Sequence, residues 1–117
     1  MEYFKEKISK LIYASASGFG QTGPLKSLPA YDMVVQGMGG LMSVTGQPDG
    51  KPTRVGTSIG DITAGLFATI GINAALFDRE KTGKGTKIDV SMLDCQIAIL
   101  ENAIARYFSN EIGRAHV

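Results

Sequence analysis

Large side chains recur at helical spacing over one long segment, and this pattern predicts a helix that begins at Asp61. At about 3.6 residues per turn, these side chains fall on one face: Ile62, Leu66, Ile70, Asn73 and Phe77. Small residues occupy most positions between them, which favours close packing on more than one side. Gly83 follows Arg79 and Lys81, an arrangement typical of the last turn and the stop of a helix.

Two shorter segments have the pattern of strands. Residues 11–15 form a short, mostly apolar run typical of a buried strand, and residues 86–90 alternate as in a half-buried strand. A loop rich in glycine and proline is predicted over residues 18–29. A turn is predicted over residues 48–52, where Asp-Gly readily supplies a positive φ.

Two further helices complete the pattern. Residues 31–38 predict a short helix that leads into an extended segment over residues 41–44. The last helix is predicted over residues 92–108, and Ser91 with Asp94 has the spacing of a capping box at its start. This order of strands and helices indicates a mixed α/β fold.

The composition is that of one small globular domain. The 117 residues are 44% hydrophobic and 20% charged, which argues against disorder. A net charge of +1 provides no field to attract nucleic acid or an anionic membrane. From the sequence we expect neither a membrane-spanning apolar run nor a signal peptide. The single cysteine, Cys95, excludes an internal disulfide and fits a cytoplasmic location.

Histidine is nearly missing from the chain, which limits its chemistry. The only histidine is His116, one residue from the end. A Ser-His-Asp or Cys-His arrangement would depend on that terminal residue, and a zinc site of histidine and cysteine lacks ligands. The groups that remain for chemistry are carboxylates, hydroxyls and backbone amides.

Residues 18–23, Gly-Phe-Gly-Gln-Thr-Gly, have the glycine spacing of a dinucleotide-binding fingerprint and follow the first predicted strand. The match is weak, because Pro24 and Pro29 interrupt what would be the following helix. In addition, no acidic residue ends a second strand at the distance that would hold a ribose. A loop whose backbone approaches a ligand closely remains an open alternative.

Asp61 has two interpretations at the start of its helix. It can be an N-cap or first-turn carboxylate with a purely structural role. The same position can also serve chemistry, because a helix N-terminus stabilises an ionised carboxylate whose reference pKa is about 3.9. Gly60 removes bulk beside it, and an approachable, ionised carboxylate can act as a covalent nucleophile.

Other polar and sulfur-containing side chains favour structural roles. We expect Asp94 to be a cap, Asp89 to face solvent and Cys95 to be a small buried hydrophobe. Three methionines are predicted to lie in the core: Met33, Met38 and Met42. Four basic residues favour a solvated turn over a phosphate-binding patch: Arg79, Lys81, Lys84 and Lys87.

Several stretches of the chain occur in the order and register of one known family, from about residue 8 to residue 110. They are residues 11–24, 29–32, 40–50, 52–56, 60–61, 71–76 and 82–85. With them the chain resembles the middle part of the class III CoA-transferase family, also called the CaiB/BaiF family. The catalytic aspartate of that family sits in a Gly-Asp pair, which corresponds to Gly60 and Asp61.

The resemblance implies a CoA-transferase that moves CoA between carboxylic acids. Asp61 would attack an acyl-CoA thioester to form a mixed anhydride and then an aspartyl-CoA thioester. The coenzyme A thioester is then a substrate, and no metal or permanently bound cofactor is required. The partners implied are acyl-CoA and small carboxylic acids, without nucleic acid or membrane.

The resemblance also implies that Pro29, Ala30, Tyr31 and Asp32 line the CoA site. Tyr31 bears on the type of reaction, because relatives that racemise α-methylacyl-CoA carry a histidine base at this position. Tyrosine has a reference pKa of about 10 and is a poor base at neutral pH. The sequence therefore favours acyl transfer. An α-methylacyl-CoA racemase or epimerase remains one alternative, and a non-catalytic binding or assembly domain with Asp61 as a helix cap remains another.

Members of the family are several times longer than this chain. The resemblance therefore implies a fragment of a Rossmann-like large domain with parallel strands and packed helices, from a family of dimers that form interlocked rings. We expect residues 1–111 to be a partial CoA-transferase family III domain. Residues 112–117 match a translated sequencing adapter, so we expect a non-native tail. We expect the fragment to be inactive and poorly soluble, and its parent to be a cytoplasmic homodimer.

Overall fold

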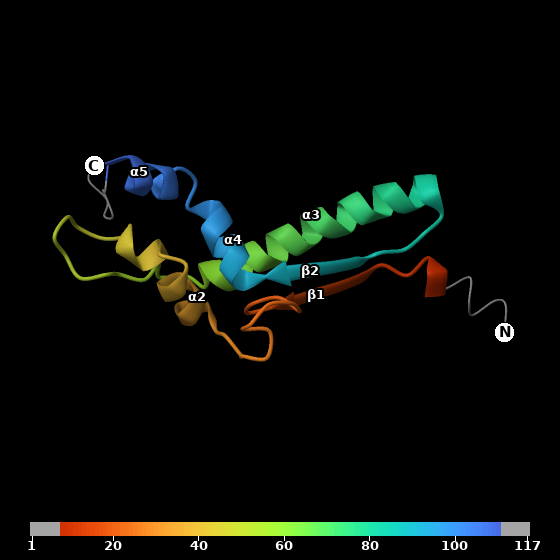
Figure 1. The fold of residues 1–117 in the computed structure, drawn as a ribbon, viewed down its shortest axis with the longest axis horizontal. Helices are drawn as coiled ribbons and strands as arrows, with labels where there is room; N and C mark the ends of the chain where they lie inside the picture. Colours follow the sequence, from red (N-terminus) through yellow and green to blue (C-terminus); the bar gives the residue numbers. More distant parts are fainter. Residues whose placement is uncertain (1–7, 111–117) are drawn as a thin grey trace.

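The structure, a computed structural model, describes residues 8–110. The predicted tail over residues 112–117 lies outside the described residues. The elements run along the chain as shown in Figure 1. They are β1 (Tyr13–Ser17), α2 (Asp32–Met38), the short 3₁₀ helix η1 (Leu41–Ser43), α3 (Ile59–Thr82), β2 (Lys87–Ser91), α4 (Met92–Ile99) and α5 (Ala103–Asn110).

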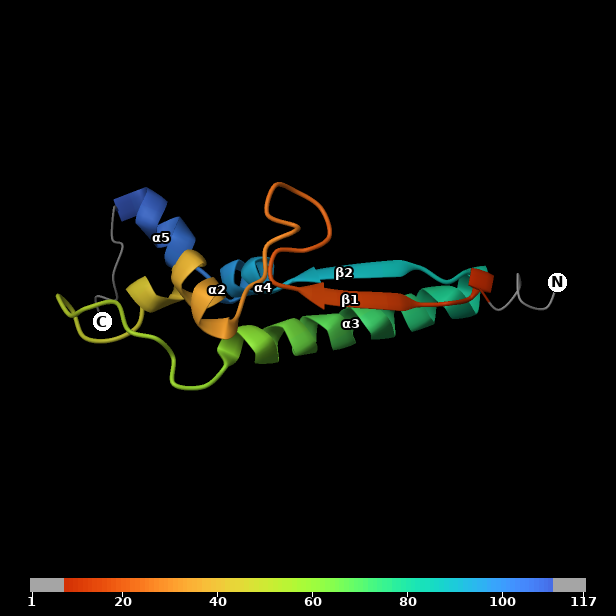
Figure 2. The same cartoon turned by 90° about the horizontal axis from the view of Figure 1, so that it is seen from below.

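β1 and β2 form a parallel two-stranded sheet in which Tyr13 lies opposite Lys87. α3 runs along one face of this sheet, as Figure 2 shows. Both predicted strands are present, with β1 two residues and β2 one residue later than the pattern placed them. The expectation that the first strand is buried is wrong, because no residue of β1 is buried within this chain. The fold is therefore mixed α/β, with parallel strands and packed helices, as the sequence predicted.

α3 buries its small residues and leaves its large ones exposed. The buried positions carry little side-chain volume: Gly60, Thr63, Ala64 and Ala75. The exposed positions include four large apolar residues: Ile62, Leu66, Ile70 and Phe77. The helix stops as predicted, because Gly83 adopts a left-handed φ of 69° and its N–H bonds to the carbonyl of Arg79 at 2.8 Å. The close-packed face of this helix is thus the one that lacks large side chains.

The length and apolar composition of α3 correct the expectation that the chain has no membrane-spanning apolar run. By length and composition, α3 is the one helix within residues 8–110 that could cross a membrane, whereas no apolar run of that length is expected from the sequence. Core helices of soluble proteins have the same length and composition. The helix packs its small face on the sheet and on α4, as expected for a helix inside a larger α/β domain.

Two predicted elements are wrong in detail. Residues 41–44 are not extended, because hydroxyls of this segment bond back to the backbone: Ser43 Oγ donates to the Gly40 carbonyl at 2.6 Å and Thr45 Oγ1 to the Leu41 carbonyl at 2.7 Å. The last helix is not continuous but breaks into α4 and α5 at Glu101, which has a positive φ of 53°.

The hydrophobic core is small and lies where α2, α3 and α4 meet at one end of the sheet. Its buried members are Val35, Ala64, Val90, Met92 and Cys95. Cys95 is buried as predicted, but Met33 and Met38 are exposed rather than part of the core. The molecule measures 64 × 27 × 26 Å, and its radius of gyration of 18.0 Å exceeds the roughly 13 Å expected of a compact domain of this length. The apolar residues outside the core therefore lack covering layers.

Candidate functional site

The predicted catalytic residue, the predicted CoA-binding segment and the glycine loop lie near the carboxyl ends of β1 and β2. The two parallel strands end at the same edge of the sheet. α3 runs antiparallel to them, so its first turn lies at that edge, next to α2 and α4 (Figure 1). The glycine loop over residues 18–23 leaves β1 at the same place. Ligands of open parallel α/β sheets bind outside the carboxyl ends of the strands. This edge, with Asp61 in it, is therefore the candidate site.

A hydrogen bond joins two segments that the sequence analysis treated separately. Oδ1 of Asp32 accepts the backbone N–H of Gly60 at 2.7 Å, over a separation of 28 residues. The bond places the pair Tyr31–Asp32 against the pair Gly60–Asp61. The predicted catalytic residue and the predicted CoA-binding segment thus belong to one site.

Gln36 extends this connection into the loop before α3, and sequence reasoning missed it. Its side chain is fully buried. Nε2 donates to Oδ2 of Asp32 at 2.8 Å, and Oε1 accepts the N–H of Val55 at 2.8 Å. Nε2 also lies 3.4 Å from the carbonyls of Val55 and Thr57. The one local signal was the Asp-Gln spacing of four residues on an otherwise apolar helix.

Gly60 has a steric role that differs from the predicted one. A Cβ built on Gly60 would lie 2.7 Å from Cγ2 of Val35 and 3.0 Å from Oδ1 of Asp32. Such distances are well below ordinary carbon contacts. Glycine at position 60 therefore serves the close approach of α2 to α3, and does not merely clear space beside Asp61.

Asp61 is the third residue of α3, and its side chain is exposed. The N-cap position belongs to Ser58, so the interpretation of Asp61 as the N-cap is wrong, while a first-turn position is confirmed. Within residues 8–110, no hydrogen bond or ion pair engages its carboxylate. The carboxylate lies at the positive end of the helix dipole. Asp61 is therefore a free, accessible carboxylate on a fixed backbone.

The four predicted CoA-binding residues differ in their exposure and in their hydrogen bonds within the chain. The Tyr31 side chain is 79% exposed and Pro29 is exposed as well. Ala30 packs against the core and touches the position where a Cβ on Gly18 would sit. Asp32 already uses both carboxylate oxygens within the chain. Tyr31 and Pro29 are thus the members of the segment that are free to meet a ligand.

The glycine loop is fastened to the second strand. The N–H of Gln21 donates to Oδ2 of Asp89 at 2.8 Å. Asp89 is exposed, as predicted, but its carboxylate also holds this loop. The N–H of Leu93 in the first turn of α4 donates to the Gly18 carbonyl at 3.1 Å. The loop continues through turns and not directly into a helix, which is unlike a dinucleotide-binding fingerprint.

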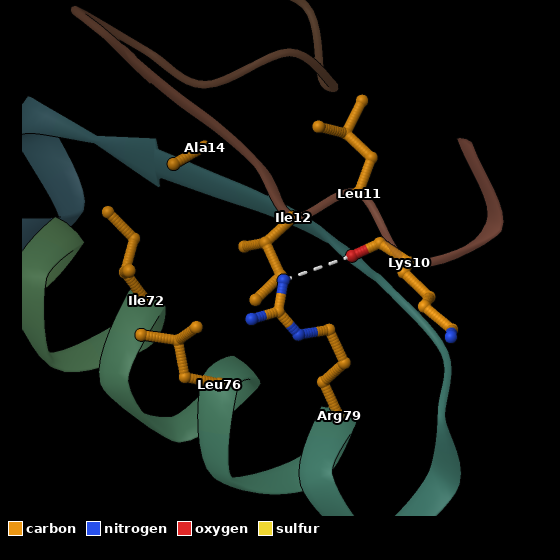
Figure 3. Close-up of a pocket in the computed structure, with 7 residues that line it drawn as sticks. All are labelled: Lys10, Leu11, Ile12, Ala14, Ile72, Leu76 and Arg79. Carbon is orange, nitrogen blue, oxygen red and sulfur yellow. Dashed lines mark hydrogen bonds between the residues drawn. The ribbon is translucent and has the colours of Figure 1, made fainter. Parts of the chain in front are cut away.

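A cavity along α3 and the buried Cys95 lie away from the Asp61 site. An open cavity of about 520 Å³ lies between β1 and the far half of α3, lined mainly by apolar side chains (Figure 3). In this cavity Arg79 donates from Nη1 to the Lys10 carbonyl at 3.2 Å. Outside the cavity, Nζ of Lys81 lies 4.3 Å from the ring centre of Phe77. In the core, burial, helped by the charge of Asp94, raises the pKa of the Cys95 thiol, which makes it a poor nucleophile.

Comparison with known proteins places this geometry in a family. The sequence matches the model of CoA-transferase family III over residues 2–116. The chain belongs to CoA-transferase family III. It is 59% identical over 96 residues to an acetyl-CoA:oxalate CoA-transferase of Acetobacter aceti, a match that covers 81% of this chain and 25% of the relative. It is 44% identical over 112 residues to a succinate–glutarate CoA-transferase of Agrobacterium fabrum, covering 92% of this chain and 28% of the relative.

A solved structure supports the same assignment for this CoA-transferase family III chain. The crystal structure of a CaiB/BaiF family protein from Brucella suis superposes with a TM-score of 0.86 at 41% identity. The match covers 95% of this chain and 29% of that protein. The family resemblance read from the sequence is therefore confirmed, and the chain spans about a quarter of the length of the curated relatives it matches.

Proposed function

We propose that this chain is part of an acyl-CoA:carboxylate CoA-transferase in which Asp61 is the covalent nucleophile. The observation that carries the proposal is the free carboxylate of Asp61 on the first turn of α3, at the carboxyl edge of the sheet. Membership of CoA-transferase family III supports the reaction type. The names of the two curated relatives support small carboxylates, such as oxalate, succinate or glutarate, as the class of acid exchanged.

The reaction follows from carboxylate chemistry. An oxygen of Asp61 attacks the thioester carbonyl of the donor, forming a mixed anhydride and expelling CoA thiolate. The thiolate attacks the Asp61 carbonyl of the anhydride, which yields an aspartyl-CoA thioester and the free donor acid. The acceptor carboxylate then attacks that thioester to form a second anhydride. The released CoA thiolate attacks the acceptor's carbonyl in this second anhydride, so that the new acyl-CoA leaves and the Asp61 carboxylate is regenerated.

Each of these steps builds negative charge on a carbonyl oxygen, which requires hydrogen-bond donors placed in advance. The first turn of α3 contributes its positive dipole end. Its Gly60 N–H, however, is already bonded to Asp32. The family resemblance implies that the main donors come from a glycine-rich loop outside this chain. We therefore expect the 117-residue chain to be inactive by itself.

The exposed tyrosine at position 31 bears on the alternative chemistry of α-proton exchange. A racemase needs two bases, and tyrosine is a weak one at neutral pH. The Tyr31 side chain is open to solvent. Acyl transfer is thus the reaction that these residues support best.

A segment graft tests the proposal in a complete enzyme. In this graft, the 96-residue segment aligned in the Acetobacter aceti relative is replaced by the corresponding residues of this chain. We expect CoA transfer from acetyl-CoA to oxalate, a CoA adduct on the peptide that carries Asp61, and loss of both in Asp61→Asn. Asp78→Asn, on the exposed far end of the same helix, is the matched control.

Two results of the graft experiment would count against the proposal. Undiminished turnover by the Asp61→Asn graft would return Asp61 to a structural role. Deuterium uptake at the α-carbon of a 2-methylacyl-CoA, without acyl transfer, would instead indicate a racemase. A graft that transfers CoA with a trapped aspartyl adduct agrees with neither.

The assembly of the parent remains part of the proposal. The exposed apolar residues of α3 are the kind of surface that another layer of protein covers. We propose a cytoplasmic homodimer for the full-length enzyme, with residues 1–111 as part of its CoA-transferase domain. Sedimentation of the graft tests the oligomeric state.

A further inference from the structure

Helix α3 receives its cap from another helix. Ser58 occupies the N-cap position of α3, but its side chain makes no capping hydrogen bond. An N-cap side chain normally accepts the N–H of the second or third helical residue. In α3 the second residue is Gly60, and its N–H donates to Oδ1 of Asp32, the first residue of α2. Asp32 therefore caps α3 in place of Ser58.

The orientation of the Asp32 carboxylate is in turn fixed by Gln36. The backbone N–H of Val55 is a donor only, so the group of Gln36 that meets it must be Oε1. The other group, Nε2, then faces Oδ2 of Asp32. The amide of Gln36 thus has one orientation that satisfies both neighbours. Because this side chain is fully buried, losing the Val55 bond would leave Oε1 without a partner, and losing the Asp32 bond would leave Nε2 with only the two backbone carbonyls at 3.4 Å.

The bonds end one residue before the nucleophile. Gly60 precedes Asp61, and Val55 lies in the loop that leads into α3, so Asp32 and Gln36 together fix the backbone on the approach to Asp61. Covalent attack needs the reacting atoms within about 3.5 Å and in line, and a displacement of about 1 Å can slow a reaction about a hundredfold. The position of the Asp61 carboxylate therefore depends on these bonds.

We infer that Asp32, held by Gln36, is a positioning residue for Asp61 and not a contact to CoA. The inference rests on the proposed role of Asp61. It reverses the assignment of Asp32 to the CoA-binding segment, because both oxygens of its carboxylate already accept hydrogen bonds within the chain. Tyr31 next to it, with an exposed side chain, is left as the residue of that pair that faces the ligand.

The test compares three variants of the graft. In Asp32→Asn, the new amide can accept from Gly60 or from Gln36 but not from both, since one of its two groups is a donor. Gln36→Leu removes the support without touching Asp32. The double variant Asp32→Asn with Gln36→Glu exchanges donor and acceptor, so that position 32 again accepts from Gly60 and position 36 still accepts from Val55. The rescue is only partial, because a glutamate oxygen then faces the carbonyls of Val55 and Thr57 in place of a donor.

We expect each single variant to lower kcat about 10- to 100-fold while KM for acetyl-CoA stays within about twofold, and the double variant to recover part of the kcat. Hydrogen exchange followed by mass spectrometry on the same proteins should show faster exchange at the start of α3 in the single variants. A raised KM with unchanged kcat would make Asp32 a CoA ligand and overturn the inference.

Three further outcomes are decisive. If the unsubstituted graft already exchanges freely at residues 58–61, Asp32 does not cap α3, and this result stands even where a variant fails to fold. If Asp61→Asn retains turnover while Asp32→Asn loses it, Asp61 is not the nucleophile. The capping of α3 by Asp32 is then tested only by hydrogen exchange at the start of α3. Unchanged kcat in both single variants would refute the positioning role with the nucleophile intact.

Discussion

Gly60 lies so close to Val35 that a Cβ on Gly60 would stand 2.7 Å from Cγ2 of the valine. This contact joins the start of α3 to the buried side of α2, one residue before Asp61. The candidate nucleophile is thus positioned by a close helix-to-helix approach that glycine alone permits. The consequence is a site whose geometry is sensitive to a single methyl group.

We predict that Gly60→Ala destabilises the chain by about 1–3 kcal/mol, since the methyl group forces Val35 or the helix to move. Gly65→Ala is the matched control on the same helix, because nothing lies within 4 Å of a Cβ there. Alanine has the better helix propensity, so the control should gain up to about 1 kcal/mol. Urea unfolding measures both, and equal stability of the two variants would contradict the close approach.

The sequence predicted the helices and strands whose signals are local. Gly83 marked the end of α3 with its left-handed φ, and the alternation before Ser91 marked β2. Ser91 also proved to be the N-cap of α4, where it accepts the N–H of Asp94 at 3.2 Å. Glu101, by contrast, breaks the last helix without a glycine or proline to announce it.

The residues of the candidate site could be proposed one by one from the sequence, but their arrangement could not. The helix start and the family motifs identified Asp61, whereas the bonds from Asp32 and Gln36 to residues 55–60 depend on tertiary packing that no local pattern encodes. The exposure of the large apolar residues of α3 could not be predicted for a related reason. Helical spacing shows which side chains share a face, but not which face the rest of the protein covers.

A second prediction concerns Thr63 and Gln96, which join α3 to α4. Nε2 of Gln96 donates to Oγ1 of Thr63 at 3.1 Å, while Oε1 of this fully buried glutamine has no hydrogen-bond partner among the described residues. Thr63→Val removes the one acceptor of Nε2 and should cost about 1–3 kcal/mol. Gln96→Leu removes both polar groups, and Thr63 still donates to the Ile59 carbonyl at 2.8 Å.

The leucine variant should therefore be less damaging than the valine variant, although it deletes the same hydrogen bond. Chemical unfolding of both variants and of the double variant gives the comparison. A leucine variant that is the less stable of the two would show that the glutamine amide is better satisfied than the described contacts indicate.

A third prediction follows from Cys95, a residue that is 5% exposed. Burial first, and the charge of Asp94 second, raise its pKa in the folded chain. Stability is then unaffected at low pH, where the thiol is protonated in both states. Above the unfolded pKa of about 8.5, only the unfolded chain ionises readily, so stability falls with rising pH until the folded pKa is passed.

Unfolding measured from pH 7 to 10, with Cys95→Ala as the reference, isolates this contribution as the difference between the two pH profiles. Alkylation by iodoacetamide should also be slow until denaturant is added. Identical pH profiles together with rapid alkylation of the folded chain would place the thiol at the surface.

The last prediction concerns the apolar stripe of α3, where Leu66 and Ile70 are 59% and 63% exposed. Replacing both with lysine should raise the solubility of the 117-residue chain while changing its stability by less than about 1 kcal/mol, because neither side chain is buried in it. In the graft the same pair should impair folding or assembly, since the missing three quarters of the enzyme would cover this face. Thr69→Lys, at an exposed polar position of the helix, is the control for added charge. A graft that tolerates both lysines with full activity would show that the stripe faces water in the complete enzyme, and the apolar residues of α3 would then need an explanation other than burial.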